Sequence, residues 1–363
     1  SAAMESVASL ARLLERGSLD ELGEELKHVS PGPNDVDTKE KLSQRSPDKK
    51  ERELLASAFQ KLVELIEVPR FYDELDEAKL YNPSSLPELT KLADTFKQQA
   101  SVALKAWCVI SASVDMRHCV TPSLHAKAIA SLACYGELGE GACAWASEAH
   151  ARMAQTASRR LSTTPGEEDD VVNSIAAKLL QCLKSSPKPS SSSKPSSSSS
   201  SSSSAASETA VVCQAARVHA LEWVVLRLEH PVVSDVFGRY LLPTLLEVID
   251  QSDLAKKAAG MRMLAHCNAH LMLATIRYHA PVILDRIRAT LPYHKAFIED
   301  PLQRSLIHIL PKLDPRDVST SALRVSVAGS VIREIEFVSL SANDEPLARV
   351  RSIGKNLPRC RIS

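Results

Sequence analysis

The sequence predicts an all-α fold, and three observations support this prediction. Ala and Leu are abundant, while only 11 of the 363 residues are glycine; this balance favours helices, because glycine is costly inside them. Apolar residues recur at the spacing of one helix face along most of the chain, as at Val7, Leu10, Leu13 and Leu14. The chain has no Asn-Gly or Asp-Gly hairpin turn and no alternation of strands with helices, which argues against the β-containing classes.

The N-terminal region, residues 1–184, is expected to be a series of amphipathic helices. Ser18 followed by Glu21 forms the sequence pattern of a capping box at the start of the second helix. The prolines from Pro69 to Pro87, with a turn at Asn82-Pro83, predict an irregular connection. The expected helices cover 4–17, 18–29, 49–68, 86–113, 124–136, 141–161 and 167–184.

A serine-rich segment, residues 185–207, separates this region from the rest of the chain. Its composition cannot bury apolar surface, so we expect a flexible tether or a long disordered loop. The C-terminal region, residues 208–363, again shows helical spacing. The segment 321–340 has β-branched residues compatible with a strand, but its neighbours favour a helix. The expected helices cover 208–228, 234–250, 253–279, 280–292 and 300–313, besides 321–340.

One part of this region, "LLPTLLEVIDQSDLAKKAAGMRML", has the order of a HEAT repeat. A first helix contains a proline, an aspartate lies at the turn, and a second helix has basic residues and then small ones. Neither helix can bury its apolar face alone, so we expect the two to pair. Asp253 is expected to cap the second helix. The positions that define the pattern are Leu242, Pro243, Leu246, Ile249, Asp250, Asp253, Lys257, Gly260 and Leu264.

A second copy begins 38 residues later, where Pro281 aligns with Pro243 and Ile287 with Ile249. Leu284 aligns with Leu246 in the same register. A period of about 40 residues is typical of HEAT-type arrays. The sequence therefore predicts a HEAT/armadillo-like α-solenoid of antiparallel helix pairs, with an irregular helical bundle as the alternative.

The stretch from about Leu221 to Leu313 resembles one family in particular, the second Tti subunit (Tel-two-interacting protein two) of the TTT (Tel–Tti–Tti) complex. The resemblance lies in "LEWVVLRLEHPVVSDVFGRYLLPTLLEVIDQSDLAKKAAGMRMLAHC" and "YHAPVILDRIRATLPYH". It covers about a quarter of the chain, and much of its pattern is shared by any HEAT repeat. It implies a non-catalytic scaffold, cytoplasmic and nuclear, whose complex acts with a heat-shock chaperone. That complex would mature and stabilise phosphatidylinositol-3-kinase-related kinases, which act in DNA-damage and nutrient signalling.

Charge and composition limit the other function classes. The 44 basic and 44 acidic residues balance, which argues against a dedicated nucleic-acid binder. No apolar window approaches the length of a membrane span, and no basic cluster adjoins an apolar helix. The eight cysteines form no C-x-x-C pair, and we expect reduced, mostly buried thiols. Trp107, Trp145 and Trp223 are each expected in the packing between helices rather than as exposed anchors.

Two groups of side chains contain residue types that can bind metals. His266 and His270 lie one turn apart, as in the H-E-x-x-H zinc motif, but Cys267 replaces the general base of that motif. The set Cys108, His118, Cys119 and His125 matches no zinc spacing. We therefore predict no catalytic, cofactor-binding or metal-binding residue. The alternatives are another HEAT-repeat adaptor, in nuclear transport or the cytoskeleton, and last a helical metal-dependent enzyme using His266 and His270.

Overall fold

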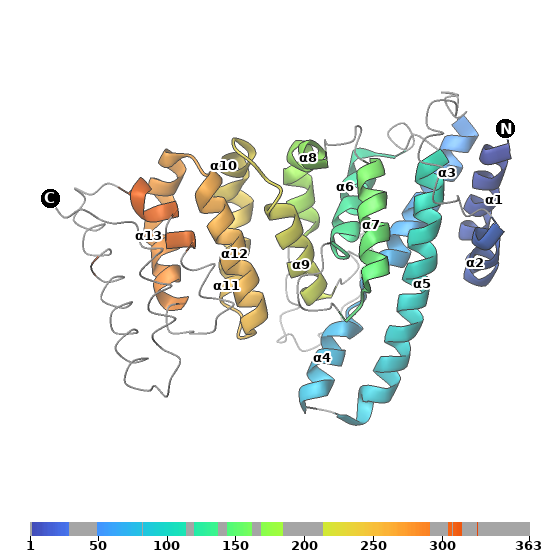
Figure 1. Cartoon of the computed structure of the whole chain (residues 1–363), viewed down its shortest axis with the longest axis horizontal. Helices are drawn as coiled ribbons and strands as arrows, with labels where there is room; N and C mark the ends of the chain where they lie inside the picture. The colour runs from blue at the N-terminus through green and yellow to red at the C-terminus, as the bar shows by residue number, and fades with distance from the viewer. Residues whose placement is uncertain are drawn as a thin grey trace, which may run out of the picture. The chain divides into compact units, whose positions relative to one another are not determined.

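The computed structural model describes residues 2–28, 49–81, 83–113, 120–136, 144–161, 168–183, 213–290, 304–306, 308–313 and 325. This part of the chain is almost entirely helical and contains no β-strand, which confirms the predicted all-α class (Figure 1). The α-helices are α1 (Ala2–Arg16), α2 (Leu19–His28), α3 (Lys49–Ile66), α4 (Phe71–Tyr81), α5 (Leu86–Ser113), α6 (Pro122–Ala133), α7 (Glu148–Leu161), α8 (Glu168–Cys182), α9 (Gln214–Val225), α10 (Val232–Val236), α11 (Leu242–Ile249), α12 (Leu254–His270) and α13 (Leu273–Thr290). Short 3-10 helices cover Pro83–Ser85 and Leu310–Lys312, and a π-helical turn, η4, covers Phe237–Leu241.

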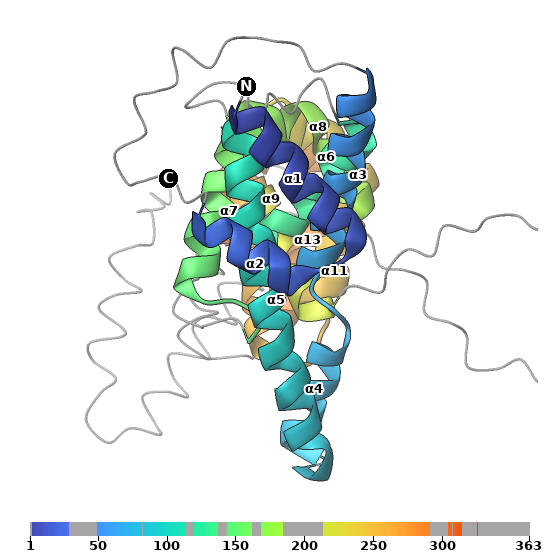
Figure 2. The ribbon, with the colours of Figure 1, turned by 90° about the vertical axis from the view of Figure 1, so that its right-hand side faces the viewer.

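Two compact units make up the chain, Ser1–Val224 and Val225–Ser363. In unit 1 the helices form two successions. Helix α1 contacts α3, α3 contacts α6 and α6 contacts α8, while α2 contacts α5 and α5 contacts α7. The two successions also contact each other through α1 with α2, α3 with α5 and α6 with α7. In Figure 2, α3, α6 and α8 lie on the right, with α2 and α7 on the left.

Aromatic side chains fill the interior of unit 1. Trp107 of α5 is fully buried and meets Phe59 of α3 edge-on, with ring centroids 5.1 Å apart. Tyr135 follows α6, and its hydroxyl donates to the Ile66 carbonyl across 2.8 Å. All three tryptophans are buried, as predicted, because each is surrounded by neighbouring helices.

Helix α4 corrects the sequence prediction of an irregular connection from Pro69 to Pro87. Tyr72, Leu75 and Ala78 are buried at helical spacing, and the Tyr72 hydroxyl donates to the Ala93 carbonyl of α5 across 3.2 Å. The prolines flank this helix instead of interrupting it, and a proline is tolerated just outside a helix. The prediction was therefore wrong about this helix, and Asn82 of the predicted turn lies outside the described residues.

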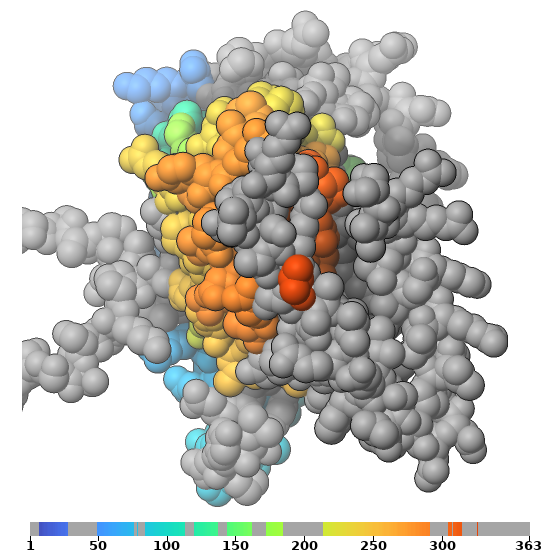
Figure 3. All heavy atoms as spheres, turned by 90° about the vertical axis from the view of Figure 1, so that its left-hand side faces the viewer, coloured from blue at the N-terminus to red at the C-terminus, as the bar shows by residue number. Residues whose placement is uncertain are grey.

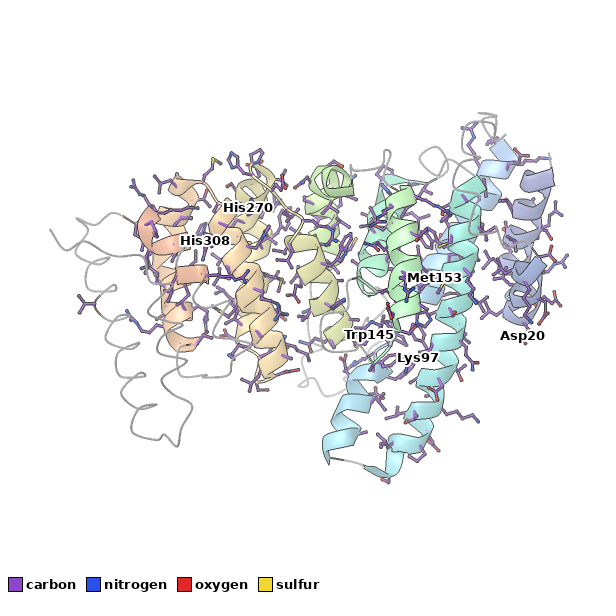
Figure 4. All side chains as sticks on the ribbon, in the orientation of Figure 1. Asp20, Lys97, Trp145, Met153, His270 and His308 are labelled. Carbon is purple, nitrogen blue, oxygen red and sulfur yellow. The ribbon has the colours of Figure 1, made fainter. Side chains whose placement is uncertain are left out.

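Helix α7 begins at Glu148, seven residues later than the sequence prediction of a helix from residue 141. Ser147 and His150 define the start: the Ser147 amide donates to His150 Nδ1 (3.1 Å), and the His150 amide donates to Ser147 Oγ (3.3 Å). This reciprocal arrangement is a capping box with histidine in the place of Glu or Gln. Trp145 precedes the helix, and its indole N–H donates to the Cys134 carbonyl (Figure 4).

The first compact unit ends after Val224, within α9. The first turn of α9 is held by unit 1, because the Cys213 amide donates to the Val68 carbonyl across 3.0 Å. The Asp73 carboxylate of α4 also accepts from the Gln214 amide at 2.8 Å. The chain therefore continues in unit 1 for several residues after the serine-rich segment.

Unit 2 begins with a helical stretch, α10 to α11, that is broken by the π-helical turn. Pro243 lies in the first turn of α11, directly after this turn. Proline has no amide hydrogen and its ring crowds the preceding turn, so a change in helical pitch here is expected. The buried side of α11 faces α12, and the two helices form the most closely packed pair of unit 2.

The helix break after α12 lies at Leu271, not after His279 as the sequence analysis predicted. The Met272 amide donates to Ser234 Oγ across 3.0 Å, and Leu271 adopts an extended conformation. Pro281 then lies inside α13 instead of starting a helix. The break is thus set by contacts with residues distant in sequence.

Several predictions lie outside the described residues. These are the serine-rich segment 185–207, the start at Asp300-Pro301 of the second helix of the second repeat copy, and the segment 321–340 apart from Val325. The five cysteines that the structure describes are free thiols. Cys134, Cys213 and Cys267 are buried, in accord with the prediction, whereas Cys182 is exposed.

Candidate interaction surface

The α11–α12 pair contains all nine positions of the repeat pattern. Leu242, Ile249 and Leu264 are buried, Leu246 is half-buried and Pro243 is exposed. Gly260 marks the closest approach of the two helices: a Cβ atom added there would lie 2.7 Å from the Cγ1 atom of Ile249. An alanine at this contact would require the Ile249 side chain or the α11 backbone to shift.

Polar groups organise the turn between α11 and α12. The Asp253 carboxylate caps α12 by accepting from the Ala255 amide across 2.8 Å. Asp250 forms an ion pair with Arg286 of α13. The buried Lys257 ammonium donates to the Ile249 carbonyl at the end of α11. Burial lowers the pKa of Lys257, and the nearby Asp250 carboxylate opposes that shift. These contacts connect three successive helices at one end.

The other end of α12 is completed by Lys312. Its ammonium donates to the carbonyl oxygens of Asn268 (2.7 Å), Ala269 (3.2 Å) and Leu271 (3.4 Å). The last carbonyls of a helix have no partner within the helix, and a cation there also interacts favourably with the helix dipole. The Asn268 amide group donates in turn to Ser305 Oγ across 2.8 Å.

His266 and His270 do stack on one face of α12, with ring centroids 4.4 Å apart. His266 Nε2, however, hydrogen-bonds to the Leu228 carbonyl at 2.9 Å. Burial lowers the pKa of His266, and that hydrogen bond opposes the shift. Burial lowers the pKa of His308, and the nearby His270 contributes to the same shift. Both histidines are labelled in Figure 4. Among the described residues, no group of three or more His, Cys, Asp or Glu side chains could hold a metal ion.

The second set considered for metal binding is only partly described. Cys108 donates from its thiol to the Met153 carbonyl across 3.4 Å, and burial raises the pKa of that thiol. Burial lowers the pKa of His125, and a hydrogen bond with the Leu161 backbone opposes this shift. His118 and Cys119 lie outside the described residues.

Among the described residues of unit 2, several large exposed apolar side chains lie on or beside the outer face of α13. Tyr278 is 81% exposed and Val282, one turn further on, is 46% exposed. Met272 and Leu273, at the start of the helix, are also substantially exposed. The space-filling view of Figure 3 shows atoms of α13, in orange, at the surface. We call Tyr278, Val282 and the arginines beside them, Arg277 and Arg288, the α13 face.

A pocket of about 230 Å³ lies in unit 1 against one side of α7. Trp223 closes it on the side of α9, and the ion pair between Arg152 and Glu148 lines it as well. Its volume is below the range of about 300 to 1,000 Å³ typical of ligand sites.

The α13 face was missed in the sequence analysis. Tyr278 and Val282 belong to an apolar pattern that predicts a core-facing helix, and the pattern does not distinguish the buried apolar side from an exposed one. No local signal in the sequence of α13 marks this face, because the neighbouring helices decide which side of α13 is covered.

No protein-family model matches the chain, and the search of curated proteins finds no match. None of the described helices is both long and apolar enough to cross a membrane.

Proposed function

We propose that the chain is a non-catalytic scaffold built of HEAT-like antiparallel helix pairs, which binds partner proteins through helical surfaces. The observation that carries the proposal is the α13 face, where Tyr278 and Val282 project into solvent from a helix whose opposite side is buried. Exposed apolar side chains that lie side by side are a feature of protein interaction sites when they belong to a larger apolar patch. Tyrosine and arginine are also enriched among the residues that dominate binding energies.

The solenoid architecture is supported by the succession of helix contacts in unit 1 and by the α11–α12 pair. The 38-residue register adds to this support, because Leu245 and Ile283 are buried at equivalent positions, as are Ile249 and Ile287. In such arrays each repeat packs only against its neighbours, which leaves long surfaces for partners.

The resemblance to the second Tti subunit suggests which partners these are. We propose other helical-repeat subunits of a TTT-like complex, a heat-shock chaperone, and kinases of the phosphatidylinositol-3-kinase-related class. The chain would then act where such kinases mature, in the cytoplasm and the nucleus.

The test is quantitative affinity purification of the tagged full chain from its own cells, combined with rapid depletion of the chain. We expect helical-repeat subunits, the chaperone and a related kinase to co-purify, and the kinase half-life in a pulse-chase measurement to fall after depletion. Transport factors or tubulin as the co-purifying proteins, with kinase half-lives unchanged, would instead support a different HEAT-repeat adaptor. Stoichiometric zinc that is lost in His270→Ala would favour the metal-dependent enzyme.

A further inference from the structure

We propose that the α13 face binds an acidic amphipathic helix of a partner protein, with Tyr278 as the apolar anchor and Arg277 and Arg288 as the charged contacts. This inference rests on the proposed scaffold function and adds the place and the chemistry of one contact.

The apolar part of the α13 face is not a sign of loose packing. Ile276, Ile283 and Ile287, on the opposite side of α13, are completely buried. The helix therefore has its full core-facing stripe and a second apolar stripe on the solvent side. Tyr278 and Val282 are four residues apart, so their side chains are neighbours on the helix surface. This spacing suits the apolar stripe of another helix, which presents anchors at three- and four-residue intervals.

The charges beside this stripe favour an acidic partner. Helix α13 contains three arginines and one acidic residue, Asp285. Arg286 is ion-paired with Asp250, whereas Arg277 and Arg288 are exposed. The two arginines are eleven residues apart, which is three turns, so they lie along the same side of the helix about 16 Å apart. Carboxylates at matching intervals on a partner helix could pair with both.

Charge also argues against two other occupants. A second copy of the chain, related by twofold symmetry, would bring like arginines towards each other, because such an interface pairs one surface with itself. A nucleic acid is disfavoured because the chain as a whole has no excess of basic residues, 44 against 44 acidic ones.

The binding test uses the full chain and two synthetic, fluorescein-labelled 18-residue helical peptides. Both have leucine at positions i, i+4, i+7 and i+11; one has glutamate at the remaining surface positions and the other has lysine. Fluorescence anisotropy gives the affinity at 50 mM and 500 mM NaCl. We expect the acidic peptide to bind at least about 10-fold more tightly than its lysine twin, with the difference much reduced at the higher salt.

Variants then locate the binding site. Tyr278→Ala should weaken binding of the acidic peptide by about 30-fold, the effect of losing a dominant contact, and Tyr278→Phe should retain most of it. Arg277→Glu combined with Arg288→Glu should reverse the preference between the peptides. Leu92→Ala and Arg159→Glu, which change an exposed leucine and an exposed arginine of unit 1, are the matched controls and should bind as the unaltered chain does. Circular dichroism establishes that each variant is folded.

Equal affinity for the two peptides, or an unchanged affinity in Tyr278→Ala, would overturn the inference. Tighter binding of a single-stranded oligonucleotide at the same arginines would also overturn it, as would a self-associating chain whose dimer is lost in Tyr278→Ala. In cells, the same variants separate the two proposals. Loss of a co-purifying subunit in Tyr278→Ala supports both the scaffold function and the α13 contact. Unaffected co-purification in this variant refutes only the α13 contact. Absence of any specific partner of the unaltered chain refutes the scaffold function.

Discussion

Replacing Asp73 by alanine should destabilise unit 1, although Asp73 lies 141 residues before the first residue of the helix that it caps. Asp73 lies on α4, yet its carboxylate accepts hydrogen bonds from the first amides of α9. The Gln214 amide donates to its two oxygens at 2.8 and 3.1 Å, and the Ala215 amide donates at 3.4 Å. The Cys213 thiol donates to the same carboxylate at 3.2 Å. Asp73 therefore does for α9 what an N-cap side chain usually does from within the helix.

The size of the effect follows from this geometry. Removal of an aspartate N-cap costs about 0.5 to 2 kcal/mol, and loss of a negative charge at a helix N-terminus costs about 0.3 to 1 kcal/mol. We expect the free energy of unfolding to fall by about 2 kcal/mol in Asp73→Ala. For a unit of this size, each kcal/mol lowers the transition midpoint by about 2 to 4 °C, so the midpoint should fall by about 4 to 8 °C. Asp73→Asn, which retains one oxygen acceptor, should lose roughly half as much.

Urea denaturation and thermal unfolding of the full chain measure the loss, and hydrogen exchange at the Gln214 and Ala215 amides locates it. Glu74→Ala is the matched control, because Glu74 is the exposed neighbour of Asp73 on the same helix. The reasoning would be refuted if Asp73→Ala were as stable as Glu74→Ala, or if the two amides exchanged at unchanged rates.

Three further predictions test other parts of the fold. Gly260→Ala should lower the free energy of unfolding by about 1 to 3 kcal/mol, because the new Cβ would lie 2.7 Å from Ile249; a gain in stability would show that α11 moves away easily. Gly17→Ala should cost about 1 kcal/mol in urea denaturation, because this residue has φ +72° in the turn after α1, and no loss would argue against that conformation. Burial lowers the pKa of His266, despite its hydrogen bond to Leu228, so the unfolded chain binds the proton more readily. The stability that comes from the neutral His266 is fully present above the ordinary histidine pKa of 6.5 and is lost as the pH drops below it. Between pH 7 and pH 5, the free energy of unfolding should therefore fall less for His266→Gln than for the unaltered chain. Equal losses in urea denaturation would contradict the assignment.

Local patterns predicted much of the fold, and distant contacts account for most of what they missed. Helix α5 was predicted from Leu86 to about Ser113, in agreement with its bounds, because an unbroken helical pattern covers this stretch. The break at Leu271 could not be predicted in the same way, because Ser234 and Lys312 set it from other helices. Sequence spacing cannot reveal such a contact, since it contains no information about which helices become neighbours.

The same restriction, that sequence spacing does not reveal which helices become neighbours, applies to the candidate interaction surface. The repeat pattern identified Asp253 and Gly260 from residue type and order alone, because a cap and a close helix contact each need particular residues. The exposure of Tyr278 depends instead on which side of α13 the other helices cover. Asp73 was missed for a related reason: an aspartate in the first turn of its own helix is common, and nothing in its surroundings along the chain points to Gln214.

The hydrogen bonds of Lys312 have a consequence for how this chain can be divided or rearranged. The carbonyl groups at the end of α12 depend on an ammonium group more than 40 residues further along the chain. A fragment that stops after α13 would contain both helices of the repeat pattern and still leave the end of α12 open to water. The repeat is therefore not an interchangeable part, and a chimaera that exchanges it with another array has to include residue 312 or supply a substitute donor.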